Sequence, residues 1–264
     1  MNLPNFICIG VQRAGTTWLY ECLKEHPEIF VPEDKELHFF NDNYEEGMAY
    51  YSDFFKSANP TKQVIGELTP NYYHDFTALE RISQSLPDVK IILILREPVA
   101  RAYSHYQLSL TNQCKGMTFD DALDKRPIIK ELSMQSIFVK EVLRLFPRER
   151  VYLDLYDNLE TQPHCLIERI YNFIGVDDSF QPSSLNKRIN RIIFPELQEF
   201  FVKLGLRRFV ERIKETRLGD MIKEKYNSGD RKKVNTDLVK YKQNFNLDVC
   251  ELEKIIEQDL SHWK

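Results

Sequence analysis

The sequence predicts an α/β fold with three layers, in which helices cover both faces of a central parallel sheet. Apolar runs typical of buried strands alternate along the chain with helical patterns. The clearest run, Val89–Leu95, is continuous and rich in isoleucine, as expected for a strand buried on both faces. The first run, Phe6–Val11, leads through a glycine-flanked loop into a helical pattern. This strand, loop and helix therefore open the three-layer domain.

The remaining strands and helices of this fold follow in order. The first helical pattern stops at His26-Pro27. Further strands are expected at Val64–Leu68 and Val151–Leu155, and an amphipathic helix from about Glu131 to Phe146 precedes the second of them. This alternation implies right-handed crossovers, which place the strands parallel to one another.

The C-terminal third has a different, helical character. We expect helices near Pro195–Leu206 and Arg208–Thr216, and two last helices from about Thr236. Repeats, low-complexity tracts and flexible linkers are not seen. We therefore predict one domain over 1–264, with a helical layer from about residue 175.

Composition narrows the class of protein. The chain has 264 residues, of which 42% are apolar and 29% charged, enough for a full core. Its 36 basic and 40 acidic side chains disfavour nucleic acid as a partner. Five scattered cysteines are typical of reduced thiols. Neither a membrane-spanning run nor a signal peptide is seen, so we expect a cytoplasmic protein without a membrane partner.

The loop from Gly10 to Thr17 has the length of the phosphate-binding motif GxxxxGK(S/T), but Thr16 stands where that motif requires lysine. Glycines let backbone N–H groups face a phosphate, and the following helix directs its positive end there. The missing lysine argues against triphosphate chemistry. A small-molecule kinase using ATP and magnesium, with Asp154 as the metal-binding acid, stays open as an alternative. So does a non-catalytic nucleotide-binding module.

Two further segments carry candidate functional side chains. Arg96 follows the central apolar run, at the end of a strand where open α/β sheets bind ligands. Arg101, in the next helix, is interpreted as a structural residue paired with a surface carboxylate. Glu36 and His38 alternate with apolar residues, so an extended backbone would place both on one face. They could form a general base, or belong to a polar loop packed by its aromatic neighbours.

Both phosphate-site segments resemble those of sulfotransferases that use 3′-phosphoadenosine 5′-phosphosulfate (PAPS). Ile9–Leu19 is similar to the 5′-phosphosulfate loop, (K/R)xGTTxL after a strand, and Leu93–Tyr106 to the 3′-phosphate site, LRDPxxRxxSxY. The resemblance implies a P-loop-like fold, PAPS as the sulfuryl donor and no metal. It also implies nucleotide contacts from Arg13, Ala14, Gly15, Thr16, Thr17, Trp18, Arg96 and Ser104. The family more often has lysine at the position of Arg13, and arginine can stabilise leaving-group charge but cannot release a proton.

The acceptor side resembles glycosaminoglycan-type sulfotransferases. Residues 35–40 are similar to their (K/E)E(I/V)xFF stretch, whose glutamate deprotonates the acceptor. This makes Glu36 the expected base, with His38 as its partner or replacement and Arg13 as the third catalytic residue. Residues 66–73 are similar to the xEKTPxYF segment beside the acceptor, with Leu68 in place of lysine, which disfavours a heparan-like acceptor. Phe39, Tyr72 and Tyr73 are candidates to line the acceptor pocket, and core packing is the alternative for the two tyrosines.

A loop that closes over the nucleotide in many members has its nearest match at Ser228, Gly229 and Arg231, with residues 186–191 as a rival. The sequence thus predicts an enzyme that transfers a sulfuryl group from PAPS to a hydroxyl or amine. The acceptor would be a small natural product or carbohydrate. Its identity and the oligomeric state are left open.

Overall fold

The computed structural model describes residues 1–61, 63–110, 112–186 and 238–264. Its centre is a sheet of five strands in the order β2-β3-β1-β4-β5, and all paired strands run parallel. The strands are β1 (Phe6–Gly10), β2 (Ile29–Phe30), β3 (Val64–Leu68), β4 (Lys90–Leu95) and β5 (Val151–Leu155). The predicted parallel sheet is confirmed, and β3 and β5 have the expected bounds. The two-residue strand β2 was not predicted, because it is too short to show a period.

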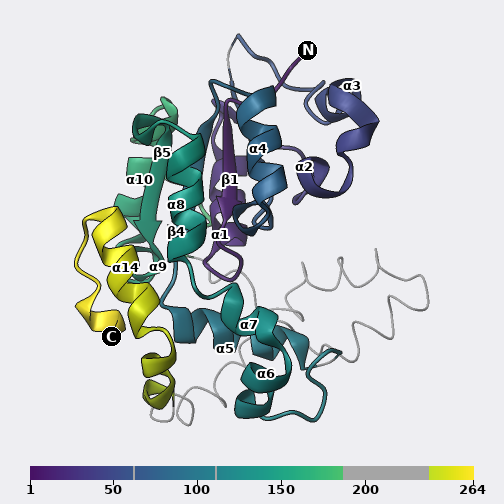
Figure 1. Ribbon diagram of the computed structural model, residues 1–264. Helices are drawn as coiled ribbons and strands as arrows, with labels where there is room; N and C mark the ends of the chain where they lie inside the picture. The colour runs from purple at the N-terminus through teal and green to yellow at the C-terminus, as the bar shows by residue number, and fades with distance from the viewer. Residues whose placement is uncertain (62, 111, 187–237) are drawn as a thin grey trace, which may run out of the picture.

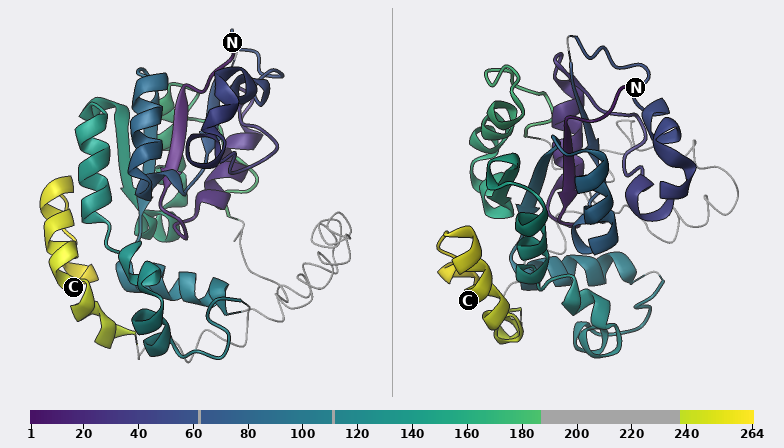
Figure 2. Two further views of the ribbon diagram at one scale, coloured as in Figure 1. Left: turned by 45° about the vertical axis from the view of Figure 1, so that its right-hand side comes forward. Right: turned by 45° about the horizontal axis from the view of Figure 1, so that its top comes forward.

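Helices cover both faces of the sheet (Figures 1 and 2). On one face lie α1 (Thr16–Glu25) and α10 (Pro163–Ile174), joined where the Tyr171 hydroxyl donates to the Cys22 carbonyl at 3.1 Å. On the other face α4 (Phe76–Ser85) contacts α8 (Ser136–Leu145). The three-layer α/β/α fold is therefore confirmed.

The other helices form the edges of the domain. They are α2 (Phe39–Asp42), α3 (Gly47–Asp53), α5 (Pro98–Ser109), α6 (Phe119–Lys125), α7 (Pro127–Glu131), α9 (Tyr156–Thr161) and α14 (Asn246–Ile256). Short 3₁₀ helices are η1 (Tyr44–Glu46), η2 (Tyr72–His74), η3 (Arg148–Arg150), η4 (Val239–Asn244) and η5 (Ser261–Trp263).

The helix expected over about 131–146 begins later, as α8 at Ser136, and Glu131 is instead the last residue of α7. The buried carboxylate of Asp248 accepts hydrogen bonds from the backbone N–H groups of Gln135 and Ser136, at 2.8 and 3.0 Å. These are donors that a helix leaves unpaired at its N-terminus, so α8 begins there. The same contact docks α14 on α8. Expected helices at 195–206 and 208–216 lie outside the described residues, and the single domain over 1–264 stays a prediction.

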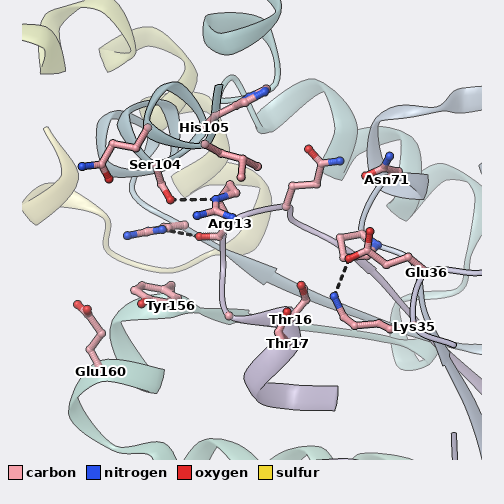
Figure 3. A pocket seen from close by; sticks show the side chains of 16 residues that line it. Arg13, Thr16, Thr17, Lys35, Glu36, Asn71, Ser104, His105, Tyr156 and Glu160 are labelled. Carbon is pink, nitrogen blue, oxygen red and sulfur yellow. Dashed lines mark hydrogen bonds and ion pairs between the residues drawn. The ribbon is translucent and has the colours of Figure 1, made fainter. Parts of the chain in front are cut away.

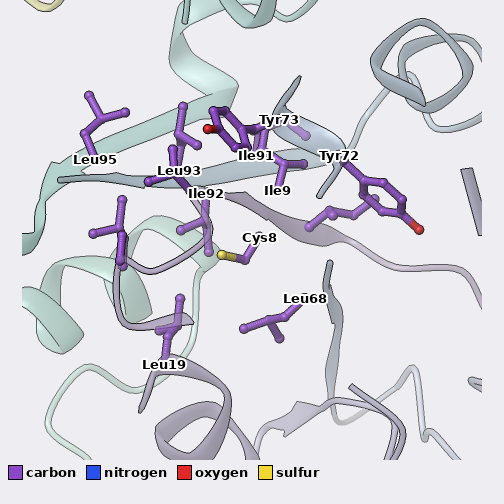
Figure 4. Close-up of a cluster of buried hydrophobic side chains, with 14 of the residues drawn as sticks. Cys8, Ile9, Leu19, Leu68, Tyr72, Tyr73, Ile91, Ile92, Leu93 and Leu95 are labelled. Carbon is purple, nitrogen blue, oxygen red and sulfur yellow. The ribbon is translucent and has the colours of Figure 1, made fainter. Parts of the chain in front are cut away.

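The core follows the alternation of the strands (Figure 4). Ile91, Leu93 and Leu95 project to one side of the sheet, whereas Ile92 projects to the other with Leu19 of α1. All of these side chains are fully buried. Because the strands are parallel, their carboxyl ends meet at one edge, and the segments that follow β1, β3, β4 and β5 gather there.

Candidate active site

A cavity of about 490 Å³ lies at this carboxyl edge (Figure 3). Its volume is in the range of small-molecule sites. It is lined by Gln12, Arg13, Gly15, Thr16, Thr17, Lys35, Glu36, Pro70, Asn71, Arg96, Ser104, His105, Gln107, Leu108, Tyr156 and Glu160. The cavity therefore brings together six of the predicted nucleotide residues and the predicted base Glu36.

The loop after β1 forms one wall of the cavity. Gly15 is left-handed, with φ of 82°, and precedes the first residue of α1. A Cβ atom there would lie 2.4 Å from Leu159 Cδ1, so the loop needs glycine. Arg13 is left-handed too, at φ 73°, which is uncommon for a residue with a side chain. This backbone leaves the N-terminus of α1 facing the cavity, where a helix attracts anions.

Two guanidinium groups, those of Arg13 and Arg96, lie at that wall. Arg13 Nε donates to Ser104 Oγ at 3.0 Å, and Arg96 donates through Nη1 to the Arg13 carbonyl. Arg96 Nε is buried without a hydrogen-bond partner in the described part of the chain. Burial, and then the charges of Arg96 and Arg101, lower the pKa of Arg13. Since neither Arg13 nor Arg96 pairs with a carboxylate of the described residues, an anion here would relieve their repulsion.

Arg101 was wrongly interpreted as a surface residue paired with a carboxylate. It is fully buried, and its Nη1 donates to Ser133 Oγ at 3.2 Å and to the Ile129 carbonyl, because α7 and the following turn cover that face of α5. One turn later, His105 Nδ1 lies 3.4 Å from Arg101 Nη1. Burial, followed by the charge of Arg101, lowers the pKa of His105 to about 4. The cavity wall therefore carries a neutral imidazole at pH 7.

Glu36 lies across the cavity from Arg13 and Ser104, with Lys35 beside it (Figure 3). Its carboxylate is 2.6 Å from Lys35 Nζ and 3.8 Å from His38 Nε2. The extended backbone expected here is wrong, because Glu36 and His38 are both left-handed, at φ 66° and 53°. Their side chains nevertheless meet. Glu36 lines the cavity, whereas His38 is not among the lining residues.

The three aromatic side chains expected in the acceptor pocket lie in the core instead. Phe39, Tyr72 and Tyr73 are each fully buried and are absent from the cavity lining. Phe39 stacks on Tyr51 with ring centroids 4.4 Å apart, and the hydroxyl of Tyr73 donates to the Leu132 carbonyl. Core packing, the alternative for the two tyrosines, accounts for their positions.

Two predicted nucleotide residues are also absent from the cavity lining. The side chain of Ala14 is buried, and Trp18 Nε1 donates to the Leu185 carbonyl at 3.0 Å. Trp18 therefore ties α1 to a distant loop. Ser228, Gly229 and Arg231 lie outside the described residues, as do residues 187–191 of the rival loop.

Asp154, the candidate magnesium ligand of the kinase alternative, has structural partners. Its carboxylate forms an ion pair of 2.9 Å with Arg169 and accepts hydrogen bonds from Tyr152 and Asn158. It is not part of the cavity lining. Within the described ranges, no group of three or more His, Cys, Asp or Glu side chains is arranged to hold a metal ion.

Several cavity residues were missed by the sequence reasoning. Lys35 and His105 directly neighbour the predicted Glu36 and Ser104, so their positions in the motifs were an available signal. Tyr156, whose ring lies 4.3 Å from the Arg96 guanidinium, comes from α9 and gave no signal before the strand order was known. Asn71 lies beyond the end of β3, at the same edge.

The family described as "Sulfotransferase domain" matches residues 3–235, most of the chain. The chain belongs to this sulfotransferase family. The family and the transferase class expected from the sequence are thereby confirmed.

Relatives of this sulfotransferase-domain protein include the heparan sulfate glucosamine 3-O-sulfotransferase 3B1 of Homo sapiens. It is 30% identical over 184 residues, which are 66% of this chain and 47% of that protein. The bifunctional heparan sulfate N-deacetylase/N-sulfotransferase 4 of Mus musculus is 28% identical over 283 residues, covering 99% of this chain and 31% of that one. The chain thus spans under half the length of these relatives.

The fold of the domain is also that of a solved structure. The sulfotransferase from Alicyclobacillus acidocaldarius superimposes with a TM-score of 0.72 and 23% identity, covering 100% of this chain and 99% of that one. At this identity the likeness concerns the fold alone. Within the described ranges, no helix combines the length and the apolar character needed to cross a bilayer. The cytoplasmic location stays a prediction.

Proposed function

We propose that this sulfotransferase-domain protein transfers the sulfuryl group of PAPS to a hydroxyl or amine of a small acceptor, a carbohydrate or natural product. Adenosine 3′,5′-bisphosphate would be released. One observation carries the proposal: Arg13, Arg96 and Ser104 converge on one side of a cavity whose other side carries Glu36. A cationic wall suits a doubly phosphorylated nucleotide, and a carboxylate facing it suits proton removal from an acceptor.

The residues of the cationic wall fit the two charged ends of such a nucleotide. Arg96, with its unpartnered Nε, and Ser104 would hold the 3′-phosphate. The N-terminus of α1, with the hydroxyls of Thr16 and Thr17, would hold the 5′-phosphosulfate. Both ends therefore meet donors that the fold already directs into the cavity.

Glu36 would take the proton of the acceptor hydroxyl. The acceptor oxygen then bonds to sulfur while the bond between sulfur and the 5′-phosphate oxygen breaks, and the electron pair leaves with the bisphosphate. Arg13 and the amides of 15–17 would neutralise that charge, and His38, whose Nε2 is 3.8 Å from the Glu36 carboxylate, would orient Glu36. As in phosphoryl transfer, positioning and electrostatics supply most of the rate.

The acceptor side of the cavity is polar. Asn71 lies near Glu36 there (Figure 3), and its amide group can donate to and accept from hydroxyls. The two heparan sulfate relatives are named for O- and N-sulfation, which supports either acceptor atom. Leu68, where lysine stands in polysaccharide enzymes, is buried and adds no cation, so we infer a small acceptor of low charge.

Nucleotide selectivity tests this proposal. By titration calorimetry, adenosine 3′,5′-bisphosphate should bind about 10- to 100-fold more tightly than AMP, since a charge-assisted contact contributes about 1.5–3 kcal/mol. Arg96→Ala should remove most of that preference, while Arg144→Ala, an exposed arginine paired with Glu141, should keep it. Equal affinity for both nucleotides would contradict the proposal, and tighter binding of ATP with magnesium would favour the kinase alternative.

A further inference from the structure

A buried carboxylate lies next to the base-bearing segment and takes no part in the proposed chemistry. Glu67, on β3, is 1% exposed. It accepts hydrogen bonds from three hydroxyls: Thr69 at 2.7 Å, Tyr72 at 2.8 Å and Tyr51. Among the described residues, no lysine or arginine pairs with Glu67. A buried charge without a cation is unusual and calls for a reason.

The hydrogen bonds of Tyr72 link Glu67 to the backbone of Phe40. Tyr72 Oη accepts the backbone N–H of Phe40 at 3.3 Å, so its own proton is directed to Glu67. Glu67 Oε1 therefore accepts a hydrogen bond from Tyr72. Burial raises the pKa of Glu67 and the three hydroxyl donors act in the opposite direction. Burial also raises the pKa of Tyr72, which keeps its phenol protonated.

The cluster reaches the segment that carries the base. Tyr72 binds the N–H of Phe40, and Tyr51 stacks on Phe39 at an interplanar angle of 14°. At the other end of the segment, the Glu36 N–H donates to the Leu68 carbonyl at 3.1 Å. Between these anchors, Glu36 and His38 have left-handed backbones, a conformation that persists only when the surroundings hold it.

We propose that Tyr72, locked by the buried Glu67 carboxylate, is a positioning residue that holds the segment from Glu36 to Phe40 with its base facing the nucleotide site. Tyr72 does not touch the acceptor. It acts through its hydrogen bond to the Phe40 N–H, and Phe40 lies two residues after His38 and four after Glu36. This inference rests on the proposed function, because Glu36 needs placement only if it removes the acceptor proton.

Paired variants separate positioning from stability. Tyr72→Phe and Tyr51→Phe each delete one hydroxyl donor to Glu67 and keep the ring, but only Tyr72→Phe also deletes the acceptor of the Phe40 N–H. Tyr51→Phe loses one buried hydrogen bond, so its melting temperature should fall by about 2–4 °C. Tyr72→Phe loses two, so its melting temperature should fall by up to about twice as much.

The kinetic expectation differs between the two variants. With PAPS and the best hydroxyl acceptor from a panel of phenols, sugars and polyols, Tyr72→Phe should lower kcat about 10- to 100-fold, because a small misplacement of a catalytic group has that effect. Its KM for PAPS should stay within about twofold of wild type. Tyr51→Phe should retain kcat within about threefold. Equal kcat losses in the two variants would overturn the proposal.

Amide hydrogen exchange supplies a readout that does not need activity. The peptide containing residues 36–42 should exchange faster in Tyr72→Phe than in wild type or Tyr51→Phe. If wild type transfers no sulfuryl group, the proposed function fails, and exchange alone decides the anchoring role. Faster exchange in Tyr72→Phe only would then uphold the anchor, and unchanged exchange would overturn it.

Discussion

The two walls of the cavity both contain left-handed residues with side chains, but different forces hold them. Beside Arg13 the loop is held by backbone hydrogen bonds, from the Val11 N–H to the Ile94 carbonyl at 3.0 Å and from the Ala14 N–H to the Val11 carbonyl at 3.2 Å, and the Arg96 side chain donates to the Arg13 carbonyl. Around Glu36 and His38 the anchors include side chains: the Tyr72 hydroxyl, bound to Glu67, accepts the Phe40 N–H, and the Tyr51 ring stacks on Phe39.

This difference explains what the sequence could and could not predict. A strand, a glycine-flanked turn and a helix are local features, so the sequence placed the Gly10–Thr17 loop and the segment after β4 at the edge of the sheet where the cavity lies. The geometry of the 36–40 segment depends on partners about 30 residues further along the chain, and alternation alone suggested an extended backbone. The side chain of Glu36 does line the cavity, but its backbone is left-handed rather than extended.

The sequence also failed to predict which polar and aromatic side chains are buried. Tyr72 and Tyr73 follow β3 at the functional edge of the sheet, and position alone could not tell a pocket wall from the core beneath it. The prediction for Arg101 was wrong for the same reason. An arginine on a helix is commonly at the surface, and the burial of Arg101 depends on packing by α7, which is a tertiary feature. Helix and strand periods report which face of an element is apolar, not what packs on a polar residue.

The largest effect is expected at the wall of the cavity that carries Glu36. Glu36→Gln keeps the size of the side chain and removes its basicity, so kcat should fall about 10²- to 10⁴-fold with a hydroxyl acceptor. The affinity for adenosine 3′,5′-bisphosphate should stay within a few-fold, because the nucleotide is held by the opposite wall. Steady-state kinetics and calorimetry measure the two quantities.

His38→Asn in the same assay sharpens the assignment. A larger loss of kcat for His38→Asn than for Glu36→Gln would make the imidazole the base and Glu36 its partner. A loss below tenfold in both variants would remove the acid/base role from this segment.

A smaller effect is expected at the opposite wall, which the loop after β1 forms. Gly15→Ala forces a Cβ into a left-handed residue, which costs about 1–2 kcal/mol, and brings it against Leu159. Gly175→Ala is the matched control, since Gly175 is also left-handed, at φ 89° and ψ 42°, and no atom lies within 4 Å of the added Cβ. Both variants should melt a few degrees lower than wild type. Only Gly15→Ala should also bind adenosine 3′,5′-bisphosphate more weakly, and equal nucleotide affinity in the two would refute the role of this loop.

Transfer of the sulfuryl group is the most direct test of the central claim. The wild-type protein would be incubated with sulfur-labelled PAPS and a panel of hydroxyl and amine acceptors, in excess EDTA, and both the labelled product and the adenosine 3′,5′-bisphosphate would be quantified. The account predicts label on an acceptor in a one-to-one ratio with the released bisphosphate, with the rate unchanged by EDTA and lost in Glu36→Gln. Transfer that stops in EDTA and returns with magnesium, or no transfer to any acceptor by a protein that binds the nucleotide, would contradict it.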